Sequence, residues 1–265
     1  MSALALLHAQ ALPGFCAASA LLGAIFGSFL GVVAERLPAW IREEEGAGNL
    51  LYPPSHCPAC QHRLSAWENI PLLSWLWLRG RCRHCRAPIP LRLLMVELLS
   101  ALFFALSAGL IPSVDIVLCL WVLWCGLLPL ALIDLRERLL PDCLTQPLLW
   151  AGLLLNVHLH FLPLADALYG ALAGYLALWL VYWGHRLATG REGLGYGDFK
   201  LLAALGAWCG WQALPSILLL AALGGIVGWA LCFRRQENDS VIPFGPFLAF
   251  AGLTLFILQH ALFTF

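Results

Sequence analysis

The sequence predicts an all-α polytopic membrane protein with about eight transmembrane helices and one long cytoplasmic loop. Of its 265 residues, 61% are hydrophobic and only 11% are charged, whereas soluble domains carry about 25% charged residues. The formal net charge is zero, so bulk electrostatics indicate no nucleic-acid partner. The first residues lack the charged segment of a cleaved signal peptide, so we expect the mature chain to begin at Met1.

Eight apolar segments account for the predicted helices. A spanning helix needs about 20 apolar residues, and fewer where neighbouring helices bury it. The segments are residues 12–34, 94–111, 115–135, 143–162, 166–187, 199–210, 213–233 and 245–263. The segment 199–210 is the shortest, and its assignment as a span depends on the distribution of charge.

The positions of lysine and arginine predict the orientation of these spans. Eight of the fifteen such residues lie between Arg36 and Arg92, and eight spans place this group and three smaller groups on one side. The opposite loops, near residues 112–114, 159–166 and 210–214, carry none. Because positively charged loops stay cytoplasmic, we expect both termini to lie outside. A seven-span arrangement would break this pattern.

The long loop carries a predicted zinc site. It contains "CPAC" (Cys57, Cys60) and "CRHC" (Cys82, Cys85), with the spacing C-x2-C-x21-C-x2-C. Two C-x2-C turns complete a tetrahedral site of four thiolates. The alternatives are two disulfides, which a cytoplasmic location disfavours, or four unrelated cysteines. Four thiolates leave no open position for a substrate, so the predicted zinc is structural.

The predicted organisation has three parts. They are a first transmembrane helix at residues 1–34, the four-cysteine loop at residues 35–93, and a transmembrane core at residues 94–265. The loop is too short for a sizeable hydrophobic core, so we expect metal binding to supply much of its folding free energy.

Three aspartates lie at the predicted cytoplasmic face. Asp134 ends the third span in "ALIDLRERLLPD", Asp142 follows it, and Asp198 begins the sixth span in "GYGDFK". Helix capping explains Asp142 and Asp198, because an anion is favoured at a helix N-terminus. Capping does not explain Asp134, which lies near a helix C-terminus, although Arg136 or Arg138 could pair with it.

A carboxylate dyad is the functional interpretation of these residues. Two carboxylates in a partly desolvated site do not both ionise easily, so one activates water while the protonated one polarises a carbonyl. Gly195 and Gly197 add little bulk, so an extended peptide could approach Asp198 closely. The alternatives are a transporter whose carboxylates relay protons or ions, and a non-catalytic scaffold that docks through its zinc loop.

These features resemble the type IV prepilin peptidases, the intramembrane aspartic peptidases of type IV pilus and type II secretion systems. "GYGDFK" looks like their GxGD signature. "GSFLGVVAERLP", the paired CxxC turns, "ENIPLLSWLWLRGRCRHC", "IDLRERLLPD" and "PFGPFLA" look like family blocks in the family's order, so the resemblance covers essentially the whole chain. It implies that Asp134 and Asp198 form the catalytic pair, that Asp142 does not, and that residues 94–265 are the peptidase core.

The resemblance also implies substrates and cofactors. Family members remove a short basic leader from prepilins or pseudopilins at the cytoplasmic face of the bacterial inner membrane, so those substrates and membrane lipid are the expected partners. Members with the cysteine loop also N-methylate the new terminus with S-adenosylmethionine, and peptidase activity alone is the alternative. Gly31 stands where many members have asparagine, which puts methyl transfer in doubt. Glu97 is either a methyl-donor site residue or a paired residue at the entrance of a span.

Overall fold

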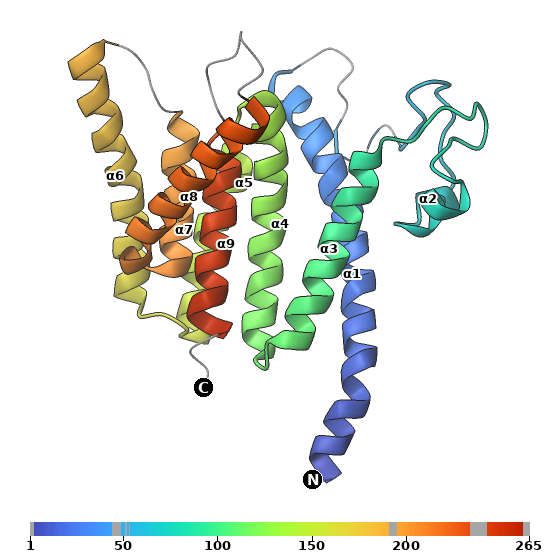
Figure 1. Cartoon of the computed structure of the whole chain (residues 1–265), viewed down its shortest axis with the longest axis horizontal. Coiled ribbons are helices and arrows are strands. Elements are labelled where there is room, and N and C mark those ends of the chain that lie inside the picture. The colour runs from blue at the N-terminus through green and yellow to red at the C-terminus, as the bar shows by residue number, and fades with distance from the viewer. Residues whose placement is uncertain are drawn as a thin grey trace. The chain divides into compact units, whose positions relative to one another are not determined.

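The computed structural model describes residues 3–43, 49–50, 52, 54–190, 195–233 and 243–261, and these residues are mostly helical (Figure 1). The longer helices are α1 (Ala3–Ile41), α3 (Leu91–Leu110), α4 (Val114–Glu137), α5 (Asp142–Leu159), α6 (Leu164–Thr189), α7 (Tyr196–Cys209), α8 (Leu214–Gly228) and α9 (Gly245–Ala261). The shorter ones are η1 (Ala66–Asn69), α2 (Leu73–Trp77), η2 (Trp211–Ala213) and the π-helical turn η3 (Trp229–Phe233).

Each predicted span overlaps one of the longer helices, in the predicted order. In the described part of the chain, five apolar helical stretches are long enough to cross a membrane. They are Leu12–Ile41, Leu91–Leu110, Val114–Glu137, Leu164–Thr189 and Trp211–Leu231. The helical membrane fold is therefore confirmed, whereas the number of eight spans stays a prediction.

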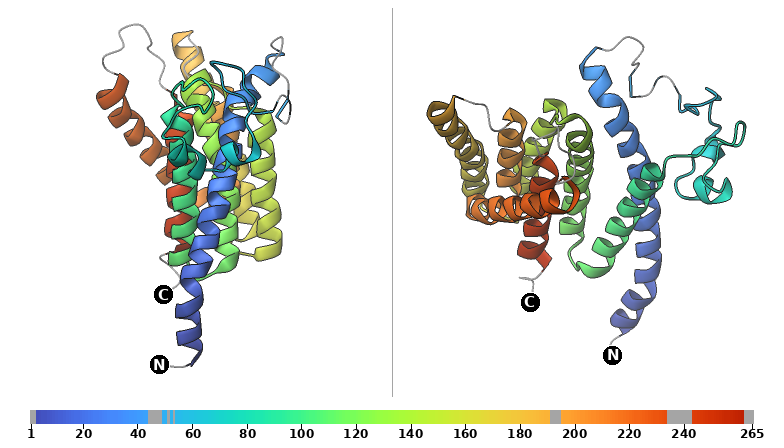
Figure 2. Two further views of the ribbon diagram at one scale, coloured as in Figure 1. Left: turned by 90° about the vertical axis from the view of Figure 1, so that its right-hand side faces the viewer. Right: turned by 45° about the horizontal axis from the view of Figure 1, so that its top comes forward.

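The chain divides into two compact units, Met1–Val117 and Leu118–Phe265, and each is described by itself. In the first unit, α1 and α3 lie side by side, as both views of Figure 2 show. Their backbones approach at small residues: a Cβ added to Gly23 would lie 2.5 Å from the Ser100 carbonyl oxygen, and one added to Gly27 would lie 2.8 Å from the Ser100 Cβ. This is the small-residue packing expected between membrane helices.

The central helix of the second unit is α7, which contacts α5, α6, α8 and α9. The side chains of Phe199, Leu205 and Trp208 are fully buried. Neighbouring helices also bond to its backbone, since Asn156 Nδ2 donates to the Ala207 carbonyl at 3.1 Å and Gln259 Nε2 donates to the Cys209 carbonyl at 3.1 Å. A helix of this length is about 21 Å long, shorter than the roughly 30 Å hydrocarbon core. Because other helices surround it, α7 need not meet lipid along its length.

Glycines allow α6 and α7 to approach at backbone distance. A Cβ on Gly174 would lie 2.6 Å from the Leu202 carbonyl oxygen, and one on Gly170 would overlap the Gly206 carbonyl. The two helices therefore pack without intervening side chains along the middle and the C-terminal half of α7.

Candidate active site and metal centre

Asp134 lies in the last turns of α4, and its side chain is 5% exposed. Its Oδ2 accepts a hydrogen bond from the backbone N–H of Gly245 at 2.9 Å. Gly245 is the first residue of α9, so the positive end of that helix faces the carboxylate. The unfavourable position of an anion at the C-terminus of α4 is thus offset by a helix from a distant part of the sequence.

Asp198 lies in the first turn of α7, and its side chain is 8% exposed. Its backbone N–H donates to the carbonyl oxygen of Gly195 at 3.2 Å, and the backbone N–H of Gly195 reaches back to its carboxylate. This reciprocal pattern is half of a capping box. Asp198 therefore has the capping role considered from the sequence. Because capping engages one backbone N–H, the carboxylate can still form other hydrogen bonds or transfer a proton.

The fold brings Asp134 and Asp198 together at one end of the second unit. Both are almost fully buried. The sequence could only suggest this pairing from topology. The starts of α7 and α9 meet at this end, since an added Cβ on Gly197 or on Gly245 would contact Leu140, which follows α4.

Leu140 holds the starts of these helices together. A Cβ on Gly197 would lie 2.7 Å from the Leu140 Cβ, and a Cβ on Gly245 would lie 3.1 Å from the Leu140 Cδ2. The space left open by Gly197 is therefore filled by Leu140. At Gly195 an added Cβ would meet the Asp198 Oδ2 at an ordinary 3.5 Å. Approach of a substrate along Gly195 and Gly197 stays a prediction.

Asp142 has a different environment. Lys200 Nζ bonds to both of its carboxylate oxygens, at 2.6 and 2.7 Å, and the Asp142 side chain is 62% exposed. It also lies in the first turn of α5, where an anion is favoured. The ion pair joins α5 to α7 outside the buried pair of carboxylates.

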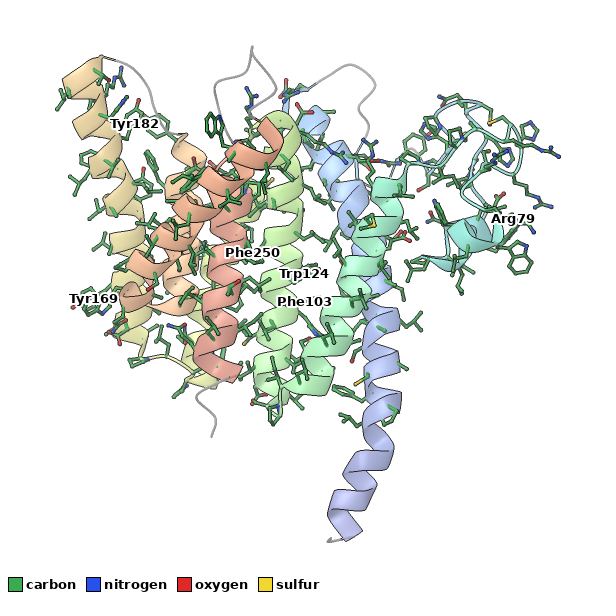
Figure 3. All side chains as sticks on the ribbon, in the orientation of Figure 1. Arg79, Phe103, Trp124, Tyr169, Tyr182 and Phe250 are labelled. Atoms are coloured by element: carbon green, nitrogen blue, oxygen red, sulfur yellow. The ribbon has the colours of Figure 1, made fainter. Side chains whose placement is uncertain are left out.

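An aromatic cluster on α6 supports the segment that carries Asp198. The buried Tyr182 ring lies 5.1 Å from the Tyr196 ring and 5.8 Å from the Phe199 ring, so it contacts the aromatic residues that precede and follow Asp198 in the sequence. Arg186 Nη1 donates to the Tyr182 hydroxyl at 3.0 Å. Figure 3 shows Tyr182 near one end of α6. Tyr182, Leu140 and Gly245 were not predicted from the sequence. For the last two, the quoted blocks "IDLRERLLPD" and "PFGPFLA" were the signal.

In the first unit, four cysteines form a compact cluster. The sulfurs of Cys57, Cys60, Cys82 and Cys85 all lie within 4.8 Å of one another. The Cys57–Cys85 and Cys60–Cys82 sulfur distances are 3.7 and 4.0 Å. Thiolates at 2.3 Å from a tetrahedral zinc would be about 3.8 Å apart. The four donors therefore fit a metal ion such as zinc.

Two similar turns build this cluster. Each CxxC turn is closed by an isolated antiparallel bridge, His56 with Arg63 and Arg81 with Pro88. Each also has a reverse turn, in which Gln61 N–H donates to the Cys57 carbonyl and Arg86 N–H donates to the Cys82 carbonyl, both at 2.9 Å. This repeated local geometry aims two sulfurs per turn at a common point.

The pKa values of the clustered thiols also favour the binding of a cation. Backbone N–H groups of Cys60 and Ala59 lower the pKa of the Cys57 thiol to about 6. A hydrogen bond from the His62 backbone lowers the pKa of Cys60, but burial and the neighbouring thiols outweigh it and raise the value to about 12. One thiolate forms readily and a second is opposed. A divalent cation would offset that repulsion.

Glu97 connects this loop to α3. Its Oε2 accepts the backbone N–H of Leu72 at 2.8 Å, and Leu72 has a φ of 61°, a conformation that bulky residues rarely adopt. The sequence left two roles open for Glu97, a methyl-donor site residue or a paired residue at the entrance of a span. The hydrogen bond to Leu72 agrees with the second role.

Comparison with known proteins gives the chain its family. The bacterial peptidase A24 N-terminal domain matches residues 21–110, and the type IV leader peptidase family matches residues 116–230. No solved structure matches the chain.

Relatives named prepilin leader peptidase/N-methyltransferase are similar over most of their length. The one from Aeromonas hydrophila is 52% identical over 252 residues, covering 88% of this chain and 87% of the relative. The one from Dickeya chrysanthemi is 49% identical over 251 residues, covering 88% of each. The one from Stutzerimonas stutzeri is 47% identical over 265 residues, covering 90% and 89%. The chain therefore belongs to the type IV leader peptidase family.

Proposed function

We propose that this protein cleaves the leader peptide of type IV prepilins or type II secretion pseudopilins and N-methylates the new N-terminus. The convergence of the buried carboxylates of Asp134 and Asp198 is the observation that carries the peptidase activity. The family and the names of relatives about 50% identical support the same activities. A transporter is disfavoured by that family membership.

In the proposed reaction the two aspartates act as one unit on a water molecule. The ionised carboxylate takes a proton from water while the protonated carboxylate donates one to the scissile carbonyl oxygen. The tetrahedral intermediate then breaks its C–N bond as a proton passes to the leaving nitrogen. The Gly245 N–H keeps one oxygen of Asp134 in place, so the carboxylate need not reorganise during proton transfer.

The methyl-transfer activity would use S-adenosylmethionine as the methyl donor. The four-cysteine loop supports it, since the family members that carry this loop are the ones implied to be bifunctional. At Gly31, where other members have asparagine, an added Cβ would make only ordinary contacts with Leu93 and Val96, at 3.8 and 4.0 Å. Glu97, engaged with Leu72, stays a candidate at the donor site.

Mass spectrometry of a candidate pseudopilin or prepilin after co-expression tests both activities together. We expect the substrate to lose its leader and to gain the mass of one methyl group. Leader loss without added mass would leave the peptidase and remove methyl transfer. An unprocessed substrate with a folded enzyme would contradict the proposal.

A substitution at Gly245 tests how tightly the dyad is held. The methyl of Gly245→Ala would lie 2.8 Å from the Asp134 Oδ2, so the carboxylate or the start of α9 must shift. A displacement of about 1 Å can cost on the order of 10²-fold in rate, and we expect a loss of about 10- to 100-fold in cleavage. Gly184→Ala is the matched control, because nothing lies within 4 Å of its added Cβ. Equal cleavage by both variants would contradict the packing argument.

We further propose eight spans with the loop and the dyad on the cytoplasmic side of the bacterial inner membrane. The C-terminus of α4 and the N-termini of α7 and α9 lie at one end of the unit. This position supports spans that alternate in direction across the membrane. At the other end of α7, a Cβ on Gly210 would lie 3.2 Å from Leu162. This contact supports placing the loop after α5 and the loop after α7 on the same side of the membrane. Reporter fusions at Gly109, Pro163 and Gly210 should give the non-cytoplasmic signal. A cytoplasmic signal at two of these positions would overturn the topology.

A further inference from the structure

The cysteine loop presents an apolar face to its surroundings. Leu73, Leu76 and Trp77 of α2 are 60%, 62% and 81% exposed, and their spacing of three and four residues places them on one side of the helix. Ile70, just before α2, is also exposed. Four large apolar side chains on one short segment exceed the scattered exposure that is normal for a protein surface.

Local structure fixes this face outward. Gly80 has a φ of 68° and its N–H donates to the Trp75 carbonyl at 2.9 Å, which ends α2 in a glycine turn. A Cβ on Gly80 would lie 2.8 Å from the Trp75 ring, so Trp75 is folded back onto the turn. Its neighbours Leu76 and Trp77 remain largely exposed.

The position of α2 relates it to the membrane-spanning part of the unit. The hydrogen bond from Leu72 N–H to Glu97 ties the start of α2 to the second turn of α3. Glu97 is about 9 Å along α3 from Leu91, and the polar interface of a bilayer is roughly 5–7 Å deep on each side. Leu91 and Met95, at the start of α3, are exposed as well. Exposed apolar side chains therefore occur on both segments that the Leu72–Glu97 hydrogen bond joins.

The charge of the loop selects among possible occupants. Between residues 54 and 90 the loop has five exposed arginines and one acidic residue, Glu68, which is buried. The arginines are Arg63, Arg79, Arg81, Arg83 and Arg86. Arg79 lies two residues after the end of α2 (Figure 3). The Arg83 guanidinium lies 4.8 Å from the Trp67 ring, which is 6.4 Å from the Trp77 ring. A second copy of this loop would be repelled, whereas anionic headgroups would be attracted.

We propose that Ile70 and the apolar face of α2 are a membrane anchor, inserted at the boundary between headgroups and acyl chains of anionic phospholipids on the loop's own side. Tryptophan is favoured at this depth, and the adjacent arginines bond to the lipid phosphates. The anchor holds the four-cysteine cluster against the bilayer beside α3. It depends on the membrane fold and not on the peptidase or methyl-transfer activity.

The test places a polarity-sensitive fluorophore on the full-length protein in nanodiscs. Genetically encoded dansylalanine replaces Trp77, and in a matched control it replaces Ala59, which is exposed between Cys57 and Cys60. The discs contain phosphatidylglycerol and a lipid with a doxyl quencher at carbon 5. We expect quenching at position 77 to be several-fold stronger than at position 59. Weak quenching at 77, or equal quenching at both positions, would overturn the anchor.

Two further measurements separate the parts of the proposal. Discs of phosphatidylcholine alone should show weaker quenching at position 77, and equal quenching in both lipids would overturn the selectivity for anionic headgroups. Glu97→Ala should also reduce quenching at position 77, because α2 is released from α3. Unchanged quenching in that variant would overturn the role of Glu97 in placing the anchor. Zinc content shows that each labelled protein keeps its folded loop.

Discussion

Asp198→Asn is expected to reduce leader cleavage by several orders of magnitude while leaving the melting temperature nearly unchanged. Asparagine keeps most of the capping at the start of α7, since it caps about as well as aspartate, and the lost dipole interaction is worth a few tenths of a kcal/mol. It cannot transfer a proton, and each acid–base role contributes roughly 10²–10⁴-fold. The measurement is cleavage of a prepilin or pseudopilin in liposomes, alongside thermal unfolding of each variant.

The same experiment separates the dyad from its neighbour. Asp134→Asn should behave like Asp198→Asn, and the double variant should be little worse than either, because the two carboxylates act as one unit. Asp142→Asn is the control, since its exposed pair with Lys200 is worth at most about 1 kcal/mol, and it should keep substantial activity. Near-normal cleavage by folded Asp198→Asn would return this residue to a capping role.

The second large effect is expected at the cysteine cluster. Wild-type protein should carry about one zinc per chain, and Cys57→Ser/Cys60→Ser should carry almost none, because a structural zinc site needs four donors. The loop between α1 and α3 should then be cut faster by proteases, since metal binding supplies much of its folding free energy. Metal analysis by mass spectrometry and limited proteolysis measure the two effects.

Control variants and activities sharpen this result. Cys143→Ser removes an exposed cysteine outside the cluster and should leave the zinc content unchanged. Methylation should fall more than cleavage in the double cysteine variant, because Asp134 and Asp198 lie on other segments. Full zinc retention after loss of both Cys57 and Cys60 would refute the site.

Local signals were enough to place the cysteine cluster. A CxxC turn defines its own geometry within a few residues, so two such turns predict four converging sulfurs without knowledge of the rest of the fold. Hydrophobic runs likewise predict helices, because the backbone of a segment in lipid must satisfy its own hydrogen bonds. Even the short α7 followed from the charge pattern, although its apolar sequence gave no sign that it is enclosed by other helices.

By itself, the sequence determined the helical membrane class, the cysteine cluster and the aspartates worth testing, because these depend on composition and on spacing within single segments. Only the tertiary structure decided that Asp134 faces Gly245 at the start of α9, that Asp142 pairs with Lys200, and that Leu140 fills the space beside Gly197. Such contacts join residues from different helices, and their geometry depends on how closely the glycine-bearing backbones pack. The hydrophobic pattern of a single segment does not determine the distance between two helices. That distance is set only when the helices pack together.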